Sequence, residues 1–300
     1  MNILITGGAG FIGSHLVDKL SQTDNNLSVI DNLHRGKIGN IKEHIDSKRI
    51  AFYEEDIRSY EEIRSKFSGI DVVYHLAAQS NVLGAVADMD YSYETNVTGT
   101  FNVLKSSLEA GVKRVIFSSS REAYGEAQYL PVDETHPLNS KNIYGASKAA
   151  GEIYCRVFRN MADMEVVIFR LSNVYGTRDF GRVIPIFFEN AAQNKDFMIF
   201  GKDKIIDFVS VEIVVDAFVK AMMLDGVQDE TAVNIGSGKG TSLIELGERI
   251  VKMTNTKAKL VIKETNKAEV NKFIAKIDKF KALFNFKPPD DPLYFLDEMV

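Results

Sequence analysis

The first thirteen residues carry the feature that most constrains the fold of this 300-residue chain. A short apolar run, Asn2–Ile5, leads through Gly7 into Gly8-Ala9-Gly10-Phe11-Ile12-Gly13, which matches the pattern G-x-G-x-x-G, and an amphipathic stretch follows. Glycines between a strand and a helix permit a tight turn and let backbone amides approach a pyrophosphate at the helix N-terminus. The sequence therefore predicts a strand-turn-helix unit that binds a dinucleotide.

The rest of the first half repeats this alternation of short apolar runs and longer amphipathic ones. The stretches that favour helices include Ile12–Ser21, Tyr91–Ala110 and Ser147–Met161. Strand-helix-strand repetition predicts an α/β fold with a doubly wound parallel Rossmann sheet, which binds ligands at the carboxyl ends of its strands. The runs that favour strands are Asn2–Ile5, Leu27–Ile30, Ile50–Tyr53, Val72–Leu76, Arg114–Ser118 and Val166–Leu171.

Three positions at strand ends indicate which dinucleotide binds. Asp31 ends the second predicted strand. A carboxylate there accepts hydrogen bonds from ribose hydroxyls and repels a 2′-phosphate, which favours NAD over NADP. Asp56-Ile57 ends the third strand, where an adenine would lie, and the small side chains of Ala77 and Ala78 after the fourth strand leave room for the cofactor.

Composition excludes several other classes of protein. The formal net charge is −5, and this mild acidity argues against a partner that is nucleic acid or a membrane surface. The single cysteine, Cys155, rules out an intrachain disulfide and a cysteine-based metal cluster, and we expect no metal site. We find neither a signal-peptide core nor a run of about 18 apolar residues, and we expect a soluble, cytoplasmic protein.

A second group of residues has the chemistry of an oxidoreductase. Ser118-Ser119-Ser120 follows the fifth predicted strand, and Tyr144 and Lys148, four residues apart, share one face of a predicted helix. Tyrosine, with a reference pKa of about 10, is a poor base unless a nearby positive charge favours the phenolate, and we expect Lys148 and a cationic nicotinamide to supply that charge. Tyr144 would then take a hydroxyl proton while hydride leaves the same carbon. Ser120 would hold the developing carbonyl oxygen.

With these motifs, the chain resembles the extended short-chain dehydrogenase/reductases of the NAD-dependent epimerase/dehydratase family, close to the UDP-glucose 4-epimerases. The resemblance implies tightly bound NAD, a nucleoside-diphosphate sugar as substrate, a transient 4-keto sugar and a homodimer through a helix bundle. It covers nearly the whole chain. The motifs that carry it are Thr6–Gly13, Asp31-Asn32-Leu33, His75–Gln79, Asn96-Val97 with Gly99-Thr100, Ser118–Gly125, Tyr144–Lys148, Arg170 to Gly176, and Asn234–Gly238.

The regular alternation loosens after about Asn173, which predicts a smaller second lobe, and the resemblance implies a set of site residues. We expect an NAD-binding Rossmann domain over residues 1–172, to which residues 205–235 return, and a smaller C-terminal substrate-binding lobe over 173–204 and 236–300. The residues expected to bind NAD are Gly7, Gly10, Phe11, Ile12, Gly13, Asp31, Asn32, Asp56, Ile57, Leu76, Ala77, Ala78, Gln79, Asn96, Ser118, Tyr144 and Lys148. Those expected to bind the substrate are Ser120, Arg121, Asn173, Arg182 and Val183.

The chain departs from the family where the substrate diphosphate binds. Family members carry one arginine before an Asp-Phe pair and another before a Gly-acidic-Val element, and here these positions are Ile206 and Asn266. Isoleucine cannot form the bidentate hydrogen bonds that arginine makes with phosphate. The candidates to supply the charge are Arg121, Arg178 and Arg182, and our hypothesis is that Arg182 contacts the diphosphate.

The pair Arg121-Glu122 is compatible with more than one reaction of the family. In the family, 4,6-dehydratases have Asp-Glu at these positions, and UDP-glucuronate decarboxylases keep the Glu. Glu122 is therefore either the fourth catalytic residue, a base at C5, or half of an ion pair that positions the loop; Arg121 could also bind a sugar carboxylate. We expect 4-epimerisation, and the alternatives are 4,6-dehydration, C5-epimerisation or decarboxylation through Glu122, or net oxidation at C4. A different class is a catalytically silent NAD-binding protein.

Overall fold

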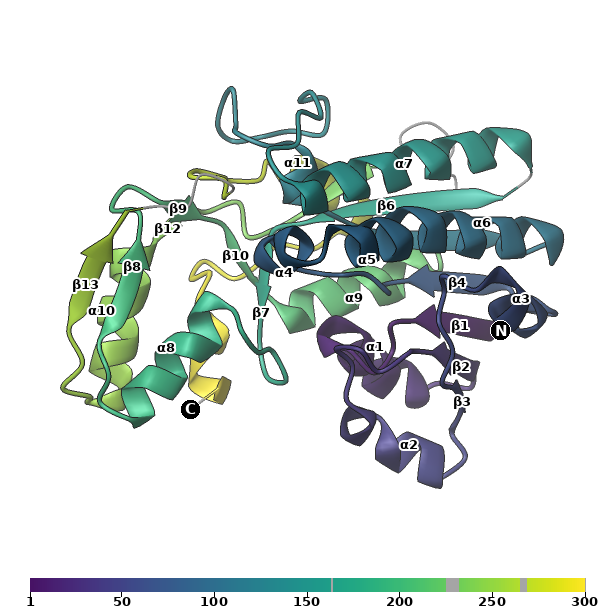
Figure 1. The fold of residues 1–300 in the computed structure, drawn as a ribbon, viewed down its shortest axis with the longest axis horizontal. Helices are drawn as coiled ribbons and strands as arrows, with labels where there is room; N and C mark the ends of the chain where they lie inside the picture. The colour runs from purple at the N-terminus through teal and green to yellow at the C-terminus, as the bar shows by residue number, and fades with distance from the viewer. Residues whose placement is uncertain (163, 225–231, 265–268, 300) are drawn as a thin grey trace.

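A seven-stranded sheet forms the centre of the computed structural model, which describes residues 1–162, 164–224, 232–264 and 269–299. Every neighbouring pair of its strands is parallel, which confirms the predicted doubly wound sheet. The strand order is β11-β6-β5-β4-β1-β2-β3, so the winding direction switches between β1 and β4 (Figure 1). The strands are β1 (Asn2–Thr6), β2 (Asn26–Ile30), β3 (Ile50–Tyr53), β4 (Val72–His75), β5 (Arg114–Ser120), β6 (Glu165–Leu171) and β11 (Ala232–Ile235).

The apolar runs of the sequence become strands because helices cover both faces of the sheet. All four residues of β4 and all seven of β5 are buried, as in strands with no solvent-facing side. The strand β5 extends two residues beyond the predicted Arg114–Ser118 and ends at Ser120. This extension carries the serines to the edge of the sheet where ligands bind in such folds.

Two layers of helices enclose the sheet. On one face, α1, α9 and α11 share a core with the strands; the other core contains side chains of α3, α6 and α7. The helices of the first face are α1 (Phe11–Ser21), α2 (Lys42–Asp46), α9 (Val211–Ala221) and α11 (Asp278–Phe284). Those of the second face are α3 (Tyr60–Ile63), α6 (Thr100–Glu109) and α7 (Ile143–Met161), and the short helices α4 (Val82–Ala87) and α5 (Met89–Tyr93) precede α6.

A smaller lobe with its own core lies beyond the carboxyl ends of the strands (Figure 1). Its helices are α8 (Val183–Ala192) and α10 (Leu243–Thr254), and β8 (Phe197–Phe200) pairs with β13 (Leu260–Lys263). Two further strand pairs lie outside the seven-stranded sheet. They are β7 (Asn173–Tyr175) with β10 (Phe208–Ser210), and β9 (Ile205–Ile206) with β12 (Thr241–Ser242).

The last third of the chain returns to the main sheet twice. Strand β11 pairs with β6, and Phe280 and Phe284 of α11 pack in the core of that sheet. The division into domains stays a prediction, but this packing places part of 236–300 against the Rossmann sheet. Within the described residues, no helix is long and apolar enough to cross a membrane. The same residues contain no cluster of His, Cys, Asp and Glu suited to a metal ion.

Candidate active site

A cavity of about 680 Å³ separates the sheet edge from the small lobe. It is lined by the glycine loop, by the ends of the strands and by the first turns of α7 and α8, and its size is that of a typical small-molecule site. The predicted site residues that line it are Gly7, Gly10, Phe11, Ile12, Gly13, Asp31, Asn32, Ile57, Leu76, Ala77, Ala78, Ser118, Ser120, Arg121, Glu122, Tyr144, Lys148, Asn173, Arg182 and Val183.

The glycine loop is built for close backbone approach. A Cβ on Gly7, whose φ is +75°, would lie 2.6 Å from the amide nitrogen of Ala77, and a Cβ on Gly13 would lie 2.1 Å from the carbonyl oxygen of Gly7. A Cβ on Gly10 would meet only the Gly7 oxygen, at 3.2 Å. Gly10 is also the N-cap of α1 and has no side chain to satisfy the first amides of the helix. The loop therefore offers a helix N-terminus to a phosphate group, and it fits a dinucleotide.

Asp31 lies at the far side of this loop and is nearly enclosed. Its carboxylate accepts hydrogen bonds from the amides of Ala9 and Leu33, both at 2.9 Å, and burial raises its pKa. Each carboxylate oxygen has a second lone pair for a ribose hydroxyl. The position and charge of Asp31 fit NAD.

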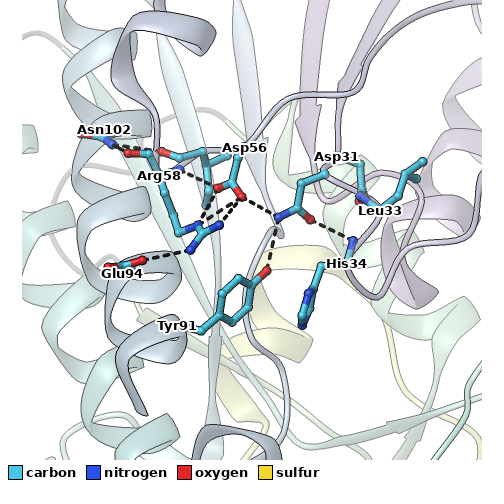
Figure 2. Close-up of polar contacts among 10 residues, drawn as sticks. Asp31, Leu33, His34, Asp56, Arg58, Tyr91, Glu94 and Asn102 are labelled. Atoms are coloured by element: carbon cyan, nitrogen blue, oxygen red, sulfur yellow. Dashed lines mark hydrogen bonds and ion pairs between the residues drawn. The ribbon is translucent and has the colours of Figure 1, made fainter. Parts of the chain in front are cut away.

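A polar network lies beside Asp31 (Figure 2), and two of its members, Asn32 and Tyr91, line the cavity. The Asn32 side chain donates to the Asp56 carboxylate at 2.8 Å and to the Tyr91 hydroxyl at 3.2 Å. Arg58 donates to the same carboxylate and forms an ion pair with Glu94 at 2.9 Å. Hydrogen bonds from Arg58 and Asn32 help to lower the pKa of Asp56 against the effect of its burial, so this side chain is a fixed carboxylate beside the cavity wall.

Three of the predicted NAD contacts, Asp56, Gln79 and Asn96, do not line the cavity. Asn96 instead accepts from the Gln79 amide at 2.8 Å, and it donates to the Gln79 carbonyl at 3.1 Å and to the Ser147 hydroxyl at 2.9 Å. It thereby ties the loop after β4 to helix α7. That Asp56, Gln79 and Asn96 bind NAD stays a prediction.

The three expected catalytic side chains come together from two elements. The side chain of Asn142 caps α7 by accepting from the Gly145 amide at 2.8 Å, which starts the helix that carries Tyr144 and Lys148. Lys148 donates to the Ser118 carbonyl at 2.8 Å, and burial lowers its pKa to about 8. Ser120 faces the same space from the end of β5.

The ionisation of Tyr144 depends on opposing effects. Enclosure in the cavity raises the pKa of its hydroxyl, whereas the positive charge of Arg182 and the hydroxyl of Ser120 lower it. Sequence reasoning assigned the favourable charge to Lys148 and the cationic nicotinamide. The cations that lower this pKa in the structure are instead Arg182, 38 positions beyond Tyr144 at the start of helix α8, and Arg121.

The carboxylate of Glu122 already has partners on both oxygens. Oε1 pairs with the Arg121 guanidinium at 2.8 Å, and Oε2 accepts from the Asn142 amide at 2.8 Å. Arg121 also donates to the Asn173 side chain at 2.6 Å. Both charged side chains are about nine-tenths buried, so the pair joins the end of β5 to α7 and β7.

The candidate arginines have different surroundings. Arg182 lines the cavity, pairs with Asp179 at 3.2 Å and lies over the Phe11 ring, whereas Arg178 pairs with Asp18 of α1 at 2.7 Å and does not line this cavity. Ile206 is buried in the core of the small lobe. Asn266 lies outside the described residues.

Sequence reasoning missed several residues that line the cavity. Lys204 and Glu269 form an ion pair in its wall, and Arg35, Asp179 and Phe180 line it beside the glycine loop. Lys204 precedes Ile206 by two residues, and this period-two spacing along a strand is the one signal that could have indicated it. The others depend on loops that the sequence pattern does not place.

Comparison with known proteins agrees with this geometry. The model of the NAD dependent epimerase/dehydratase family matches residues 3–236. A relative named putative UDP-glucose 4-epimerase, from Methanocaldococcus jannaschii, is 37% identical over 96% of this chain and 94% of its own length. A UDP-glucuronic acid decarboxylase of Arabidopsis thaliana is 27% identical over 96% of this chain and 65% of its own length.

Solved structures of epimerases have the same fold as this chain. The UDP-glucose 4-epimerase of Thermotoga maritima with UDP-glucose has a TM-score of 0.92 and 34% identity, and the match covers 99% of this chain and 96% of that one. The UDP-glucuronic acid 4-epimerase of Bacillus cereus, in complex with UDP-glucuronic acid and NAD, has a TM-score of 0.92 and 25% identity over all of both chains. This chain therefore belongs to the NAD-dependent epimerase/dehydratase family and is an NAD-dependent nucleotide-sugar epimerase/dehydratase of the extended short-chain dehydrogenase/reductase type.

Proposed function

We propose that this enzyme is a UDP-hexose 4-epimerase that works through a transient 4-keto sugar. The observation that carries the proposal is the state of Glu122 beside a complete Ser120, Tyr144 and Lys148 group. Arg121 and Asn142 hold the two oxygens of Glu122, and a proton taken from C5 would neutralise this carboxylate and leave the buried Arg121 charge without its counterion. The geometry thus favours chemistry confined to O4 and C4.

The chain's own residues handle the proton and the oxygen of this reaction. The chemistry that NAD supplies when bound is reversible hydride transfer at C4 of the sugar. The Tyr144 phenolate takes the proton from the O4 hydroxyl and later returns it, and the Ser120 hydroxyl hydrogen-bonds O4 as the carbonyl forms. The Lys148 ammonium is fixed by its hydrogen bond to the Ser118 carbonyl, and it would donate further hydrogen bonds to the ribose of the cofactor.

Two cationic side chains are our candidates for the substrate diphosphate. Arg182 and Lys204 line the cavity on the lobe side, and each is paired with a carboxylate, Asp179 and Glu269 respectively. A diphosphate would compete with these carboxylates for the two cations. Asn173 and Val183 also line the cavity, and we propose that they contact the substrate as well.

The experiment that tests the reaction is incubation with UDP-glucose, UDP-N-acetylglucosamine and UDP-glucuronate in D₂O, followed by separation of isomers and mass spectrometry. We expect one sugar to convert to its 4-epimer without a change of mass, because the hydride returns internally. Deuterium at C5 or loss of water would instead indicate proton removal at C5, for which Glu122 is the candidate base, and loss of CO₂ would indicate decarboxylation of the 4-keto sugar. Appearance of NADH in proportion to product would identify a 4-dehydrogenase.

We also propose that two copies of the chain associate through the outer faces of α4 to α7. Helices that otherwise cover the sheet expose a set of large apolar side chains there, which is unusual for a monomer. The occupant we propose is a second copy, because the helices of a symmetric pair can pack as a four-helix bundle. The residues are Val86, Met89, Tyr93, Phe101, Ile153, Val157 and Met161.

A further inference from the structure

The loop from Thr177 to Arg182, between β7 and α8, is attached to the Rossmann sheet on one side through α1. Arg178 forms an ion pair with Asp18 at 2.7 Å. The Nε2 atom of His15 lies 2.9 Å from the Thr177 carbonyl oxygen, within hydrogen-bonding distance. Both partners belong to the helix that follows the glycine loop.

The same loop is attached on its other side to the segment after β2. The Phe180 ring carries the Arg35 guanidinium and the Lys37 ammonium, each 4.9 Å from the ring centroid. Asp179 attracts Arg35, whereas Arg182 of the same loop repels it, so the ring of Phe180 is the main contact on this side. Cation–π contacts of this kind gain strength where the cation loses water, as Arg35 does at the cavity wall.

Between these attachments the loop passes over the glycine loop. The Arg182 guanidinium lies over the Phe11 ring, 5.6 Å from its centroid, and Phe11 directly follows Gly10. Phe11, Arg35, Asp179 and Phe180 all line the cavity. The loop is therefore a strap that joins α1 to the Asp31 side across the part of the cavity that fits the dinucleotide.

We propose that Phe180 is a positioning residue that retains the cofactor, because its contacts with Arg35 and Lys37 close this strap over the dinucleotide. The dinucleotide could leave at this side of the cavity only after the strap opens. The reason for retention rests on the proposed epimerase function. A hydride removed from C4 must return to the same sugar, and early loss of the reduced cofactor would release a ketone.

The test is the dissociation rate of NADH from the holoenzyme without sugar, followed by its fluorescence while excess NAD replaces it. Phe180→Ala should accelerate release by about tenfold, equivalent to about 1.4 kcal/mol. Phe180→Tyr keeps the aromatic face and should release within about twofold of the parent rate. Phe180→Leu is apolar but has no aromatic face, and its release rate should be close to that of Phe180→Ala, because it cannot make the cation–π contacts.

The matched control is Tyr129→Ala, which removes an exposed aromatic ring outside the cavity and should leave the rate unchanged. Lys37→Gln, which removes one of the two cations from outside the cavity lining, should accelerate release by about threefold and serves if Phe180→Ala does not fold. Unchanged release in folded Phe180→Ala, or in Lys37→Gln, overturns the proposal. Because no sugar is present, neither result depends on the proposed epimerase activity.

Discussion

At the scale of single residues, the pKa of Tyr144 is set by burial, which raises it, and by neighbouring side chains, chiefly Arg182 and Ser120, which lower it. Removing only the hydroxyl leaves the packing of the ring intact. The Tyr144→Phe variant therefore isolates the proton transfer from the structure of the site.

We expect Tyr144→Phe to reduce turnover of the nucleotide sugar by about 10²- to 10⁴-fold, the usual contribution of a positioned acid–base group. The variant should still hold NAD, as measured by cofactor content after purification. The control is Tyr129→Phe, since Tyr129 is exposed and lies outside the cavity. Turnover that persists in Tyr144→Phe would remove Tyr144 from the mechanism, and an inactive parent that binds NAD would favour the silent binding protein.

Asp179 gives a pH prediction at the same scale. Burial raises its pKa to about 6, so the folded state binds a proton more tightly than the unfolded state, whose carboxyl has the ordinary value of 3.8. The resulting stabilisation is complete below pH 3.8 and is lost as pH rises through about 6. Between pH 5 and pH 7.5 the chain should lose about 1 kcal/mol of unfolding free energy from this group.

The comparison with Asp179→Asn measures this loss, because asparagine has no proton to release. Urea unfolding at the two pH values should show the variant gaining stability relative to the parent as pH rises. A difference between variant and parent that stays constant from pH 5 to pH 7.5 would show that Asp179 does not titrate in this range.

At the scale of elements, a buried ion pair fixes helix α7 against strand β6. Glu152 of α7 accepts from Arg170 on both oxygens, at 2.9 and 2.7 Å, and from the Ser119 hydroxyl at 2.6 Å. Glu152 and Arg170 are both almost completely buried. The pair sets the height of α7 over the sheet, and thereby the position of Tyr144 and Lys148 relative to Ser120.

Glu152→Gln should lower the free energy of unfolding by about 3–5 kcal/mol, because it leaves the Arg170 charge buried without a counterion. The matched control is Arg156→Ala. Arg156 pairs with the same carboxylate at 3.2 Å but is 44% exposed, and its loss should cost less than about 1 kcal/mol. Equal effects of the two substitutions in urea unfolding would argue against the ion pair as the fixing contact.

At the scale of the whole molecule, the exposed apolar face of α4 to α7 predicts the oligomeric state. Ile153→Lys places a charge in the proposed interface and should convert a dimer to a monomer in analytical ultracentrifugation. Leu283→Lys is the control, since Leu283 is also exposed but lies on α11, over the opposite face of the sheet. A parent that sediments as a monomer, or an Ile153→Lys variant that stays dimeric, would contradict the proposed interface.

The sequence alone was sufficient to predict the features that depend only on residues near one another in the chain. The glycine loop, the strand ends and the helical spacing of Tyr144 and Lys148 are local, and local patterns determine backbone conformation and which side chains share a face. The doubly wound sheet followed from the alternation of these local units. Strand β11 was absent from the predicted strands, because Asn234 interrupts its apolar run and Gly236 follows it directly.

Only the tertiary structure decided how distant segments meet. Glu122 acquires its partner Asn142 from the cap of the next long helix, and Lys204 meets Glu269 from far along the chain. Phe180, in the loop before α8, meets Arg35, in the segment after β2. Such contacts depend on how the lobes pack against each other, and the period of a sequence pattern describes one element at a time. The sequence therefore indicated the chemistry, while packing decided which charges are free to take part in it.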